Sequence, residues 1–423
     1  MEKKRAPKLR FRGFTDDWEQ RKVGELTNVL SASRVHKEEW AEDGIPFFRS
    51  SDVVSAFKGT ENEKAFISIE LYEKLAKSSG KLEQNDILIT GGGSIGIPYI
   101  VPDNKPLYSK DADLIWIKHS ANFDSRYLYT YFIREEFREY LASISHTGTI
   151  AHYTIEQVKD TPVRLPLIDE QRALGDFFVS LDHLITLHQR KYDMLQKVKK
   201  SMLEKMFPKN GSKVPEIRFS GFTDDREQRK LDDLCELITK QTGFDYSATI
   251  KPSLLTEKAD NTYSFIQNKD FTGNEINMET DFYIPIEVAE RFPKILIDKP
   301  SLLISISGRI GNIGFYRLKQ KSFIGGAVGI CKLKDPDEGE FITQELESEY
   351  GQRYFQSLIK ASSHANITVE DIRNIELIFP PTKEERKQIS DFLLGLDNLI
   401  TLHQRKLEKL KKLKKSMLEE MFV

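Results

Sequence analysis

A glycine-rich segment is the part of this sequence that comes nearest to a chemical motif. Residues 91–96 read GGGSIG, the composition of a phosphate-holding loop, but lack the Gly-Lys-Ser/Thr ending of a P-loop and the GxGxxG order of a dinucleotide-binding turn. The counterpart 215 residues later, SGRIG at 307–311, lacks both patterns too. A tight turn after a buried strand is the better interpretation. Such a turn can still approach a DNA backbone, with Ser94 or Arg309 donating to phosphate.

Two further segments carry polar side chains of the kinds that contact DNA. The Arg49-Ser50-Ser51 segment corresponds to Gln267-Asn268-Lys269, and Arg, Asn and Gln read base edges in the major groove. The small residues of SHTGTIAH at 145–152, matched by SSHANI at 362–367, permit close approach to a backbone. Each residue alone also fits an ordinary solvated loop, but both segments recur in the two halves. The candidate DNA contacts are Arg49, Ser50, Ser51, Ser94, His146, Thr147, Thr149, His152, Gln267, Asn268, Lys269, Ser307, Arg309, Ser362, Ser363, His364 and Asn366.

No pattern in the sequence indicates catalysis or metal binding. We find no defensible carboxylate pair or Ser/His/Asp spacing, no nuclease or helicase motif, and no (Asn/Asp)-Pro-Pro-(Tyr/Phe) tetrapeptide, with which amino-methyltransferases hold a flipped base. Cys235 and Cys331 are distant in sequence and lack CxxC spacing, which excludes a thiolate zinc site and a disulfide framework. We interpret them as small buried hydrophobic residues. The expectation is therefore a chain with no catalytic residue and no metal ligand.

The elements that must position these residues occur twice. LITLHQRK at 184–191 returns unchanged at 399–406, and KSMLE at 200–204 returns at 415–419. The openings RFRGFTDDWEQRK at 10–22 and RFSGFTDDREQRK at 218–230 form a second repeated pair. The period is far too long for a solenoid. The sequence therefore predicts two copies of a domain plus a long helix, which suits a target with two halves.

The helix of each copy has an apolar heptad seam. From residue 169 to residue 207 a helix measures ~58 Å, and an isolated helix with such a seam needs a partner. We expect the two helices to pair antiparallel; packing on their own domains or between chains is the alternative. The predicted pairing residues are Phe177, Leu181, Leu184, His188, Leu195, Phe392, Leu396, Leu399, His403 and Leu410. The histidines are read as polar residues that fix the register, with a metal site or pH switch as the alternative.

The predicted fold class is α+β, with two similar α/β globular domains joined by two long helices that pair as an antiparallel coiled coil. The expected boundaries are domain 1 at 1–165, the central helix at 166–208, a linker at 209–214, domain 2 at 215–379 and the C-terminal helix at 380–423. The basic run of the last helix, from Arg405 to Lys415, is either a solvated face or a contact for phosphates or an acidic partner.

Composition limits the possible partners and location. The net charge of −2 provides no global basic field, so any DNA binding must come from local surface or from partners. No apolar run approaches the ~20 residues that span a bilayer, and the basic N-terminus has no apolar signal core. These features predict a cytoplasmic protein.

The globular blocks diverge while the helices are nearly identical. ILITGGGSIG at 87–96 still corresponds to LLISISGRIG at 302–311, and TIEQV at 154–158 to TVEDI at 368–372. Drift of old duplicates would also have eroded the helices. The pattern therefore favours a constant spacer that carries two different recognition surfaces.

Taken together, these motifs resemble the specificity subunit of a Type I restriction–modification enzyme, over the whole length. The resemblance rests on the RFxGFTDDxEQRK openings, on PLIDEQR at 166–172 with its weaker copy PTKEER at 381–386, on LDHLITLHQRK and LDNLITLHQRK, and on KSMLExMF. The second copy departs from the Glu-Gln pair of this family, because it has Glu385-Arg386.

The resemblance implies two target-recognition domains, each reading half of a split DNA site, and a coiled coil that sets their distance. Half-site centres are then expected one to one and a half turns apart, a turn being ~34–36 Å. It implies a non-catalytic chain without its own cofactor. Two modification subunits would bring S-adenosylmethionine and methylate adenine, and motor-nuclease subunits would join for restriction, with ATP and Mg also on the partners. One alternative is a two-headed DNA-binding scaffold without a modification partner. Another is a stand-alone methyltransferase, against which the missing tetrapeptide argues.

Overall fold

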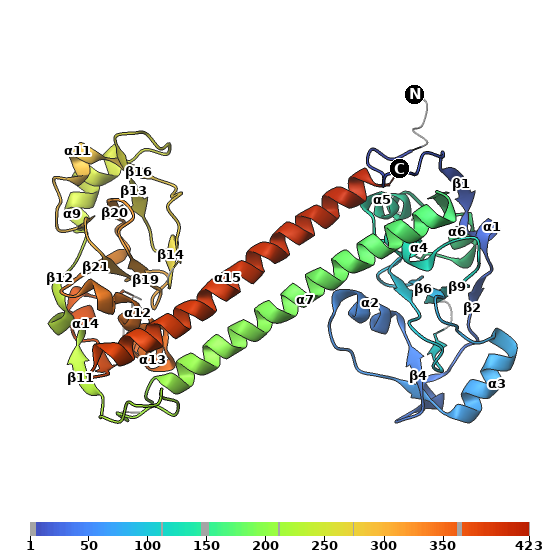
Figure 1. Cartoon of the computed structure of the whole chain (residues 1–423), viewed down its shortest axis with the longest axis horizontal. Helices are drawn as coiled ribbons and strands as arrows, with labels where there is room; N and C mark the ends of the chain where they lie inside the picture. The colour runs from blue at the N-terminus through green and yellow to red at the C-terminus, as the bar shows by residue number, and fades with distance from the viewer. Residues whose placement is uncertain are drawn as a thin grey trace. The chain divides into compact units, whose positions relative to one another are not determined.

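The structure is a computed structural model, which describes residues 6–110, 113–144, 152–209, 212–273, 275–361 and 366–422, with only the backbone for 360 and 361. The chain divides into two compact units. Unit 1 comprises residues 1–188 and 406–423, and unit 2 comprises residues 189–405. Each unit therefore contains one globular domain, the first part of the helix that leaves this domain, and the last part of the other long helix (Figure 1).

The domain of unit 1 contains two four-stranded sheets, of order β2-β9-β6-β7 and β3-β5-β4-β8, and the ribbon β1-β10. Buried runs such as ILIT and LIWI form the central strands, as their continuous apolar character predicts. The elements are β1 (Glu19–Lys22), α1 (Val23–Leu26), β2 (Val29–Ser31), η1 (Lys37–Glu39), β3 (Trp40–Ala41), β4 (Ile45–Phe48), α2 (Ser50–Lys58), β5 (Phe66–Ile67), α3 (Ile69–Ser79), β6 (Ile87–Thr90), β7 (Pro98–Ile100), β8 (Tyr108–Ser109), β9 (Leu114–Ile117), α4 (Ser125–Phe132), α5 (Glu135–Ile144), α6 (Ile155–Asp160) and β10 (Pro162–Leu165).

The domain of unit 2 repeats this plan with sheets of order β12-β21-β18-β19 and β16-β13-β20-β17 and the ribbons β11-β22 and β14-β15. In both domains the second sheet contains one parallel pair, β4 with β8 and β13 with β20. The elements are β11 (Glu227–Lys230), α8 (Leu231–Leu234), β12 (Cys235–Lys240), α9 (Gly243–Asp245), η2 (Tyr246–Ile250), α10 (Lys251–Ser253), β13 (Thr262–Ile266), β14 (Phe271–Thr272), β15 (Glu275–Ile276), β16 (Tyr283–Pro285), α11 (Ile286–Ala289), β17 (Leu296–Ile297), β18 (Ser301–Ser305), β19 (Ile313–Tyr316), β20 (Ser322–Ile324), β21 (Val328–Leu333), η3 (Pro336–Glu338), α12 (Gly339–Glu347), α13 (Glu349–Ala361), α14 (Val369–Arg373) and β22 (Glu376–Phe379).

The two cysteines lie in the first of these sheets, on neighbouring strands. Both Cys235 and Cys331 are free and buried, as the sequence predicts. The hydrogen bond between their side chains, together with burial, raises the pKa of the Cys331 thiol well above its ordinary value. Two residues that are distant in sequence are therefore in contact in the core.

The repeated openings fasten each domain to the start of its own long helix. In unit 1 Arg10 donates to both oxygens of the buried Glu170, at 2.8 and 2.6 Å, and in unit 2 Arg218 does the same to Glu385, at 2.9 and 2.7 Å. The two-pronged guanidinium matches a carboxylate, so each pair holds its segment in one orientation. The Glu of the helix motif and the Arg of the opening motif are thus partners in both copies.

The long helices are α7 (Ile168–Met206), with 39 residues, and α15 (Lys383–Glu420), with 38 residues. Within unit 1, Lys414 of α15 bonds Asp182 of α7 at 2.6 Å; within unit 2, Lys199 of α7 bonds Asp397 of α15 at 2.7 Å. In both pairs the later residue of one helix meets the earlier residue of the other. The predicted antiparallel pairing is therefore confirmed in each unit.

The seam itself differs from the prediction by neighbouring residues. Leu184 and Leu399 are more than two-fifths exposed, and Ile185 and Ile400 occupy the inward positions instead. The sequence could not separate them, because both members of each pair are apolar. The inward positions follow steps of four and three: Leu174, Phe178, Leu181, Ile185, His188, Tyr192, Leu195, Lys199, Met202 and Met206 in α7, and Ile389, Leu393, Leu396, Ile400, His403, Leu407, Leu410, Lys414, Met417 and Met421 in α15.

Phe177 and Phe392 also fall outside the seam. Their rings contact Phe11 and Phe219 of the opening segments, at centroid distances of 5.8 and 6.1 Å. Phe392 is 38% exposed despite this contact. These two phenylalanines therefore hold the opening segments on the helices rather than pairing the helices.

Candidate nucleic-acid interface

In unit 2 several loops leave one edge of the sheet β12-β21-β18-β19. The register places Lys240, the last residue of β12, opposite Gly329 of β21, and Ser305, the last residue of β18, opposite Val328. Ile313, where β19 begins, lies opposite Ile304. The loops that follow β12 and β18 and the loops that precede β19 and β21 therefore share this edge.

Hydrogen bonds bring the predicted contact segments of unit 2 together at this edge. The Asn268 amide donates to the carbonyl of Ser307 at 2.7 Å, and Asn312 donates to the carbonyl of Asn268 at 3.1 Å. Ser307 also forms an isolated bridge with Asn366. Gly308 has φ +73°, and a Cβ there would lie 3.2 Å from the Asn268 amide nitrogen. The turn thus favours glycine, and three segments distant in sequence form one surface.

The side chains at this surface differ in their freedom. Arg309 is exposed, and its guanidinium forms no hydrogen bond or ion pair with the residues that the structure describes. Lys269 is exposed but paired with Asp281. The backbone N–H of Gln267 donates to Asp270 at 2.8 Å, and burial raises the pKa of Asp270. Gln267 is half-buried, so Arg309 is the side chain placed most openly.

Unit 1 builds the same frame from other residues. The Ser50 hydroxyl and the Gly91 N–H both donate to the carbonyl of Asp113, at 2.9 and 2.8 Å, and the Tyr153 N–H donates to the carbonyl of Gly91 at 2.9 Å. In unit 2 the Ile367 N–H donates to the carbonyl of Ile306 in the equivalent way, also at 2.9 Å. The start of α2, the glycine turn and the segment after residue 151 are thus joined in one surface.

Arg49 is placed differently from the expectation. Its guanidinium pairs with Asp52 at 2.9 Å, donates to the carbonyl of Glu63 and lies over the Trp40 ring at 5.5 Å. With its side chain 19% exposed, Arg49 holds the start of α2 rather than projecting outward. The exposed positions of this surface are Ser51, Ser94 and His152. Ser51 accepts a hydrogen bond from the Asn62 amide.

Six predicted contacts lie outside the described residues. They are His146, Thr147 and Thr149 in the first domain and Ser362, Ser363 and His364 in the second. The residues that sequence reasoning missed are Asp113 and Asn312, whose backbone carbonyl and side-chain amide tie the segments together. No local signal marks them, because their role depends on partners more than 20 residues away.

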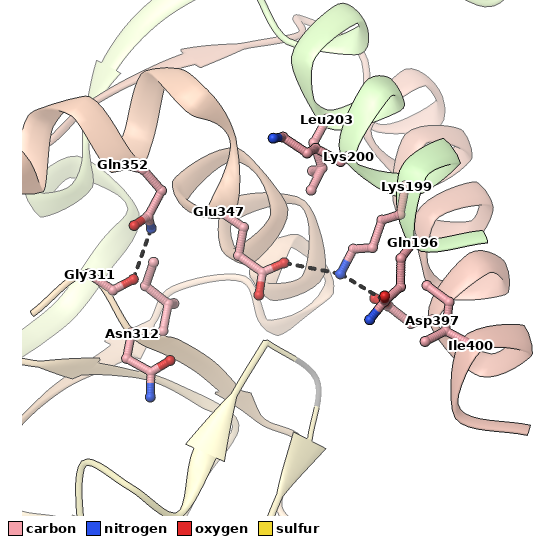
Figure 2. Close-up of a pocket in the computed structure, with 11 residues that line it drawn as sticks. Gln196, Lys199, Lys200, Leu203, Gly311, Asn312, Glu347, Gln352, Asp397 and Ile400 are labelled. Atoms are coloured by element: carbon pink, nitrogen blue, oxygen red, sulfur yellow. Dashed lines mark hydrogen bonds and ion pairs between the residues drawn. The ribbon is translucent and has the colours of Figure 1, made fainter. Parts of the chain in front are cut away.

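A pocket of about 480 Å³ in unit 2 is lined by Gly311, Asn312 and residues of α7, α12, α13 and α15 (Figure 2). Lys199 bonds Glu347 of α12 at 3.4 Å and Asp397 of α15 at 2.7 Å, and Gln352 donates to the carbonyl of Gly311 at 2.9 Å. Burial lowers the pKa of Lys199, but the combined effect of the two carboxylates is larger and in the opposite direction. The pKa is therefore raised overall, which favours the ammonium form. Polar contacts thus hold two walls of the pocket: the turn at 307–311 is bonded to α13, and α12 is bonded to the helix pair.

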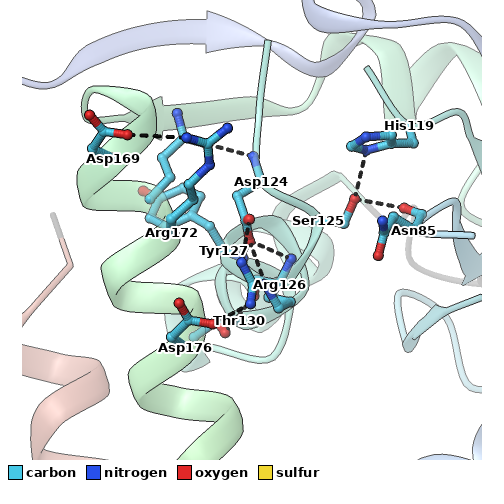
Figure 3. A network of polar contacts seen from close by, with 11 residues as sticks. Asn85, His119, Asp124, Ser125, Arg126, Tyr127, Thr130, Asp169, Arg172 and Asp176 are labelled. Atoms are coloured by element: carbon cyan, nitrogen blue, oxygen red, sulfur yellow. Dashed lines mark hydrogen bonds and ion pairs between the residues drawn. The ribbon is translucent and has the colours of Figure 1, made fainter. Parts of the chain in front are cut away.

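A polar network in unit 1 brings a serine and a histidine together without forming a catalytic triad (Figure 3). The Ser125 hydroxyl donates to the carbonyl of Asn85 at 2.6 Å and lies 3.3 Å from Nδ1 of His119. Asp86 accepts from the backbone N–H of His119 and not from its ring. A catalytic triad requires the carboxylate to orient the imidazole, and here it does not. The network instead holds the start of α4.

The described residues form neither a metal-binding cluster nor a membrane-spanning helix. No group of three or more His, Cys, Asp or Glu side chains in them is arranged to hold a metal ion. Over the same part of the chain, none of the helices combines the length and the apolar character needed to cross a membrane.

Comparisons with known proteins identify the family. The profile described as "Type I restriction modification DNA specificity domain" matches residues 15–197 and 223–412. The Type I restriction enzyme MjaVIII specificity subunit of Methanocaldococcus jannaschii is 22% identical, over 95% of this chain and 91% of its own length. The putative MjaX specificity subunit of the same organism is 23% identical, over 95% and 92%.

A solved structure shares the fold. The S subunit of a Type I restriction–modification system from M. genitalium matches with a TM-score of 0.62 and 13% identity, over 99% of both chains. Both copies of the domain match the family profile, and the matches include most of both long helices. The chain therefore belongs to the family of Type I restriction–modification specificity subunits, which are non-catalytic DNA-recognition components.

Proposed function

We propose that this chain reads a bipartite DNA site, with the first domain on one half-site and the second domain on the other. The observation that carries the proposal is a common hydrogen-bond frame with different exposed side chains. Ser51, Ser94 and His152 are exposed on the frame in unit 1, whereas Lys269 and Arg309 are exposed on it in unit 2, beside the half-buried Gln267. Because base edges are told apart by donor and acceptor pattern, two such sets should select different sequences.

The partner subunits should bind the repeated helix segments. Leu184 and Leu187 of α7 are exposed on unit 1, and Leu399 and Leu402 of α15 are exposed on unit 2. All four come from the two identical LITLHQRK segments and lie outside the seam. Identical apolar surfaces suit two copies of one partner, because buried apolar area drives association. We propose that these partners are modification subunits, which bring S-adenosylmethionine and methylate adenine, and that restriction subunits join them.

The test is sequencing of adenine methylation in the source cell, with and without this gene. Loss of one bipartite methylated motif on deletion is expected, and its return on complementation is the control. An unchanged methylome in cells that express the protein would contradict the proposal and favour a DNA-binding scaffold without a modification partner.

The assignment of one half-site to each domain is tested by exchange of residues 1–165 for the block of another family member. One half of the methylated motif should change, while the other half and the spacer stay the same, since residues 166–423 are untouched. The reciprocal exchange of residues 215–379 is the matched control. A change in both halves after a single exchange would contradict the division of labour.

A further inference from the structure

The most exposed large apolar side chain among the described residues is at the edge of the proposed reading surface of unit 2. Phe244 is 80% exposed, more than any other large hydrophobic side chain in that part of the chain. It follows β12 by four residues and therefore leaves the sheet edge from which the loop with Ser307 and Arg309 also leaves. An exposed phenyl ring in a structured turn suits contact with a ligand, because its transfer out of water is favourable.

The turn that carries Phe244 is held firmly. Thr242 caps α9, accepting from the Asp245 N–H at 3.1 Å and donating to the Asp245 carboxylate at 2.6 Å. Tyr246 and Leu254, which follow, pack on the core cluster around Ile250. Phe244 is thus presented by an ordered backbone, which lowers the entropy lost on binding.

A chain of close contacts links this turn to Gln267. Gln241, which is buried, donates to the carbonyl of Ile324 at 3.1 Å. The next residue, Gly325, passes so close that a Cβ there would lie 3.4 Å from Cγ of Gln267. The segment 241–245 is therefore linked through Ile324 and Gly325 to the predicted contact segment 267–269, which follows β13 of the other sheet.

We propose that Phe244 is a specificity-determining contact, which places its ring against a thymine methyl group in the half-site read by the second domain. The inference rests on the proposed function. Arg309 in the loop at the same sheet edge, and Gln267 and Asn268 in the linked segment, are of the types that read the major groove, and the thymine methyl is the apolar group which that groove presents. The matching segment of the first domain, ASRVH at 32–36, has no Phe, Tyr or Trp, so the contact belongs to one half-site only.

The test measures the affinity for DNA of the complex isolated through a tag on this chain, on the cognate duplex found by methylome sequencing. Single thymines are replaced by deoxyuridine, which lacks only the methyl group. At one position of the second half-site, the replacement should lower wild-type affinity about fourfold, the value of one buried methyl group. Phe244→Ala should lower affinity for the cognate site roughly tenfold and remove sensitivity to that replacement.

The matched control is Leu255→Ala, which removes an exposed apolar side chain of the same domain at the edge of the other sheet. It should leave affinity and the deoxyuridine response unchanged, and both variants should unfold at the wild-type temperature. Phe244→Leu, which keeps an apolar group, should retain part of the response.

Two results would overturn the inference: an affinity that Phe244→Ala leaves unchanged, or a deoxyuridine response that persists in this variant. A wild-type complex that prefers no bipartite site would instead overturn the proposed function, and the assay reveals that before any variant is measured.

Discussion

The second copy has Arg386 at the start of its long helix where the first copy has Gln171, and the two side chains make equivalent contacts. Gln171 donates to the carbonyl of Pro166 at 2.9 Å and accepts from the backbone N–H of Asp124, the N-cap of α4. Arg386 donates to the carbonyl of Pro380 and pairs with Glu338, the N-cap of α12, at 2.6 Å. The Glu-Arg pair thus makes the same two connections as the Glu-Gln pair, with an ion pair in place of a neutral hydrogen bond.

A buried carboxyl in α12 makes stability depend on pH. Glu345 is 1% exposed, and burial raises its pKa from 4.5 to about 8. Because the unfolded chain releases this proton at a lower pH than the folded chain, the contribution of Glu345 to stability falls as pH rises from 4.5 to 8. Glu345→Gln should therefore raise the free energy of unfolding at pH 8 by about 1–4 kcal/mol, and by less toward pH 4.5.

Denaturant unfolding of the wild type and this variant across that pH range measures the effect. Glu257→Gln, at an exposed position of the same domain, is the control and should give a curve parallel to the wild type. A parallel curve for Glu345→Gln as well would contradict the raised pKa.

At the scale of elements, the two helix pairs have a half-buried lysine at equivalent places. Lys199 and Lys414 occupy matching seam positions and bond the matching aspartates Asp397 and Asp182. The sequence suggested His188 and His403 for fixing the register, and both are half-buried in the seam. A charged pair in the seam also specifies register, because any slip would leave a lysine among apolar side chains.

Removal of the seam lysine of unit 2 should destabilise this unit. In Lys199→Ala, Glu347 and Asp397 lose the cation between them, so the free energy of unfolding should fall by about 1–3 kcal/mol. Lys197→Ala, at an exposed position of the same helix, is the matched control and should have little effect. Equal stability of the two variants in thermal unfolding would show that the ion pairs contribute nothing beyond surface charge.

At the scale of the whole molecule, each domain completes its core with the end of the helix that begins at the other domain. Phe422 contacts Trp18, Tyr127 and Phe178 in unit 1, with centroid distances of 5.4–6.0 Å. Phe207 packs on Phe341 at 5.7 Å in unit 2. Met421 and Phe422 thus belong to the core of the first domain.

This arrangement predicts destabilisation far away in sequence. Phe422→Ala should lower the stability of unit 1 by about 3–5 kcal/mol, the usual result of emptying a buried phenylalanine site. Phe207→Ala should do the same to unit 2. Hydrogen exchange resolved by peptide distinguishes the two, because protection should fall in residues 19–165 for the first variant and in residues 227–379 for the second. Loss of protection in the opposite domain would contradict this division.

The helices are also predicted to set the unread spacer of the DNA site. One heptad inserted in each helix preserves the seam and adds about 10.5 Å, so the methylated motif should gain roughly three base pairs between its halves. Seven residues inserted in the linker at 209–214 should leave the spacer unchanged. An unchanged spacer after the helix insertions would show that the helices are not the ruler.

The sequence by itself determined the two-copy plan, the extent of the long helices and the buried strands, because repeats and periodicity are local properties of a chain. The predicted helix at 169–207 is α7, Ile168–Met206, and ILIT and LIWI are strands. The sequence also predicted the recurring turns at 91–96 and 307–311, which hydrogen bonds join to other segments in the structure.

Only the tertiary structure decided which of two adjacent apolar residues faces inward, as with Leu184 and Ile185, because periodicity accepts either. Only it showed that Arg49 is held by Asp52 and Trp40, and that Arg10 binds Glu170 across 160 positions of sequence. Such pairs depend on which surfaces folding brings together. A side chain that pattern alone suggests for DNA can therefore be bound within the protein, while Phe244, which pattern did not suggest, lies open at the sheet edge.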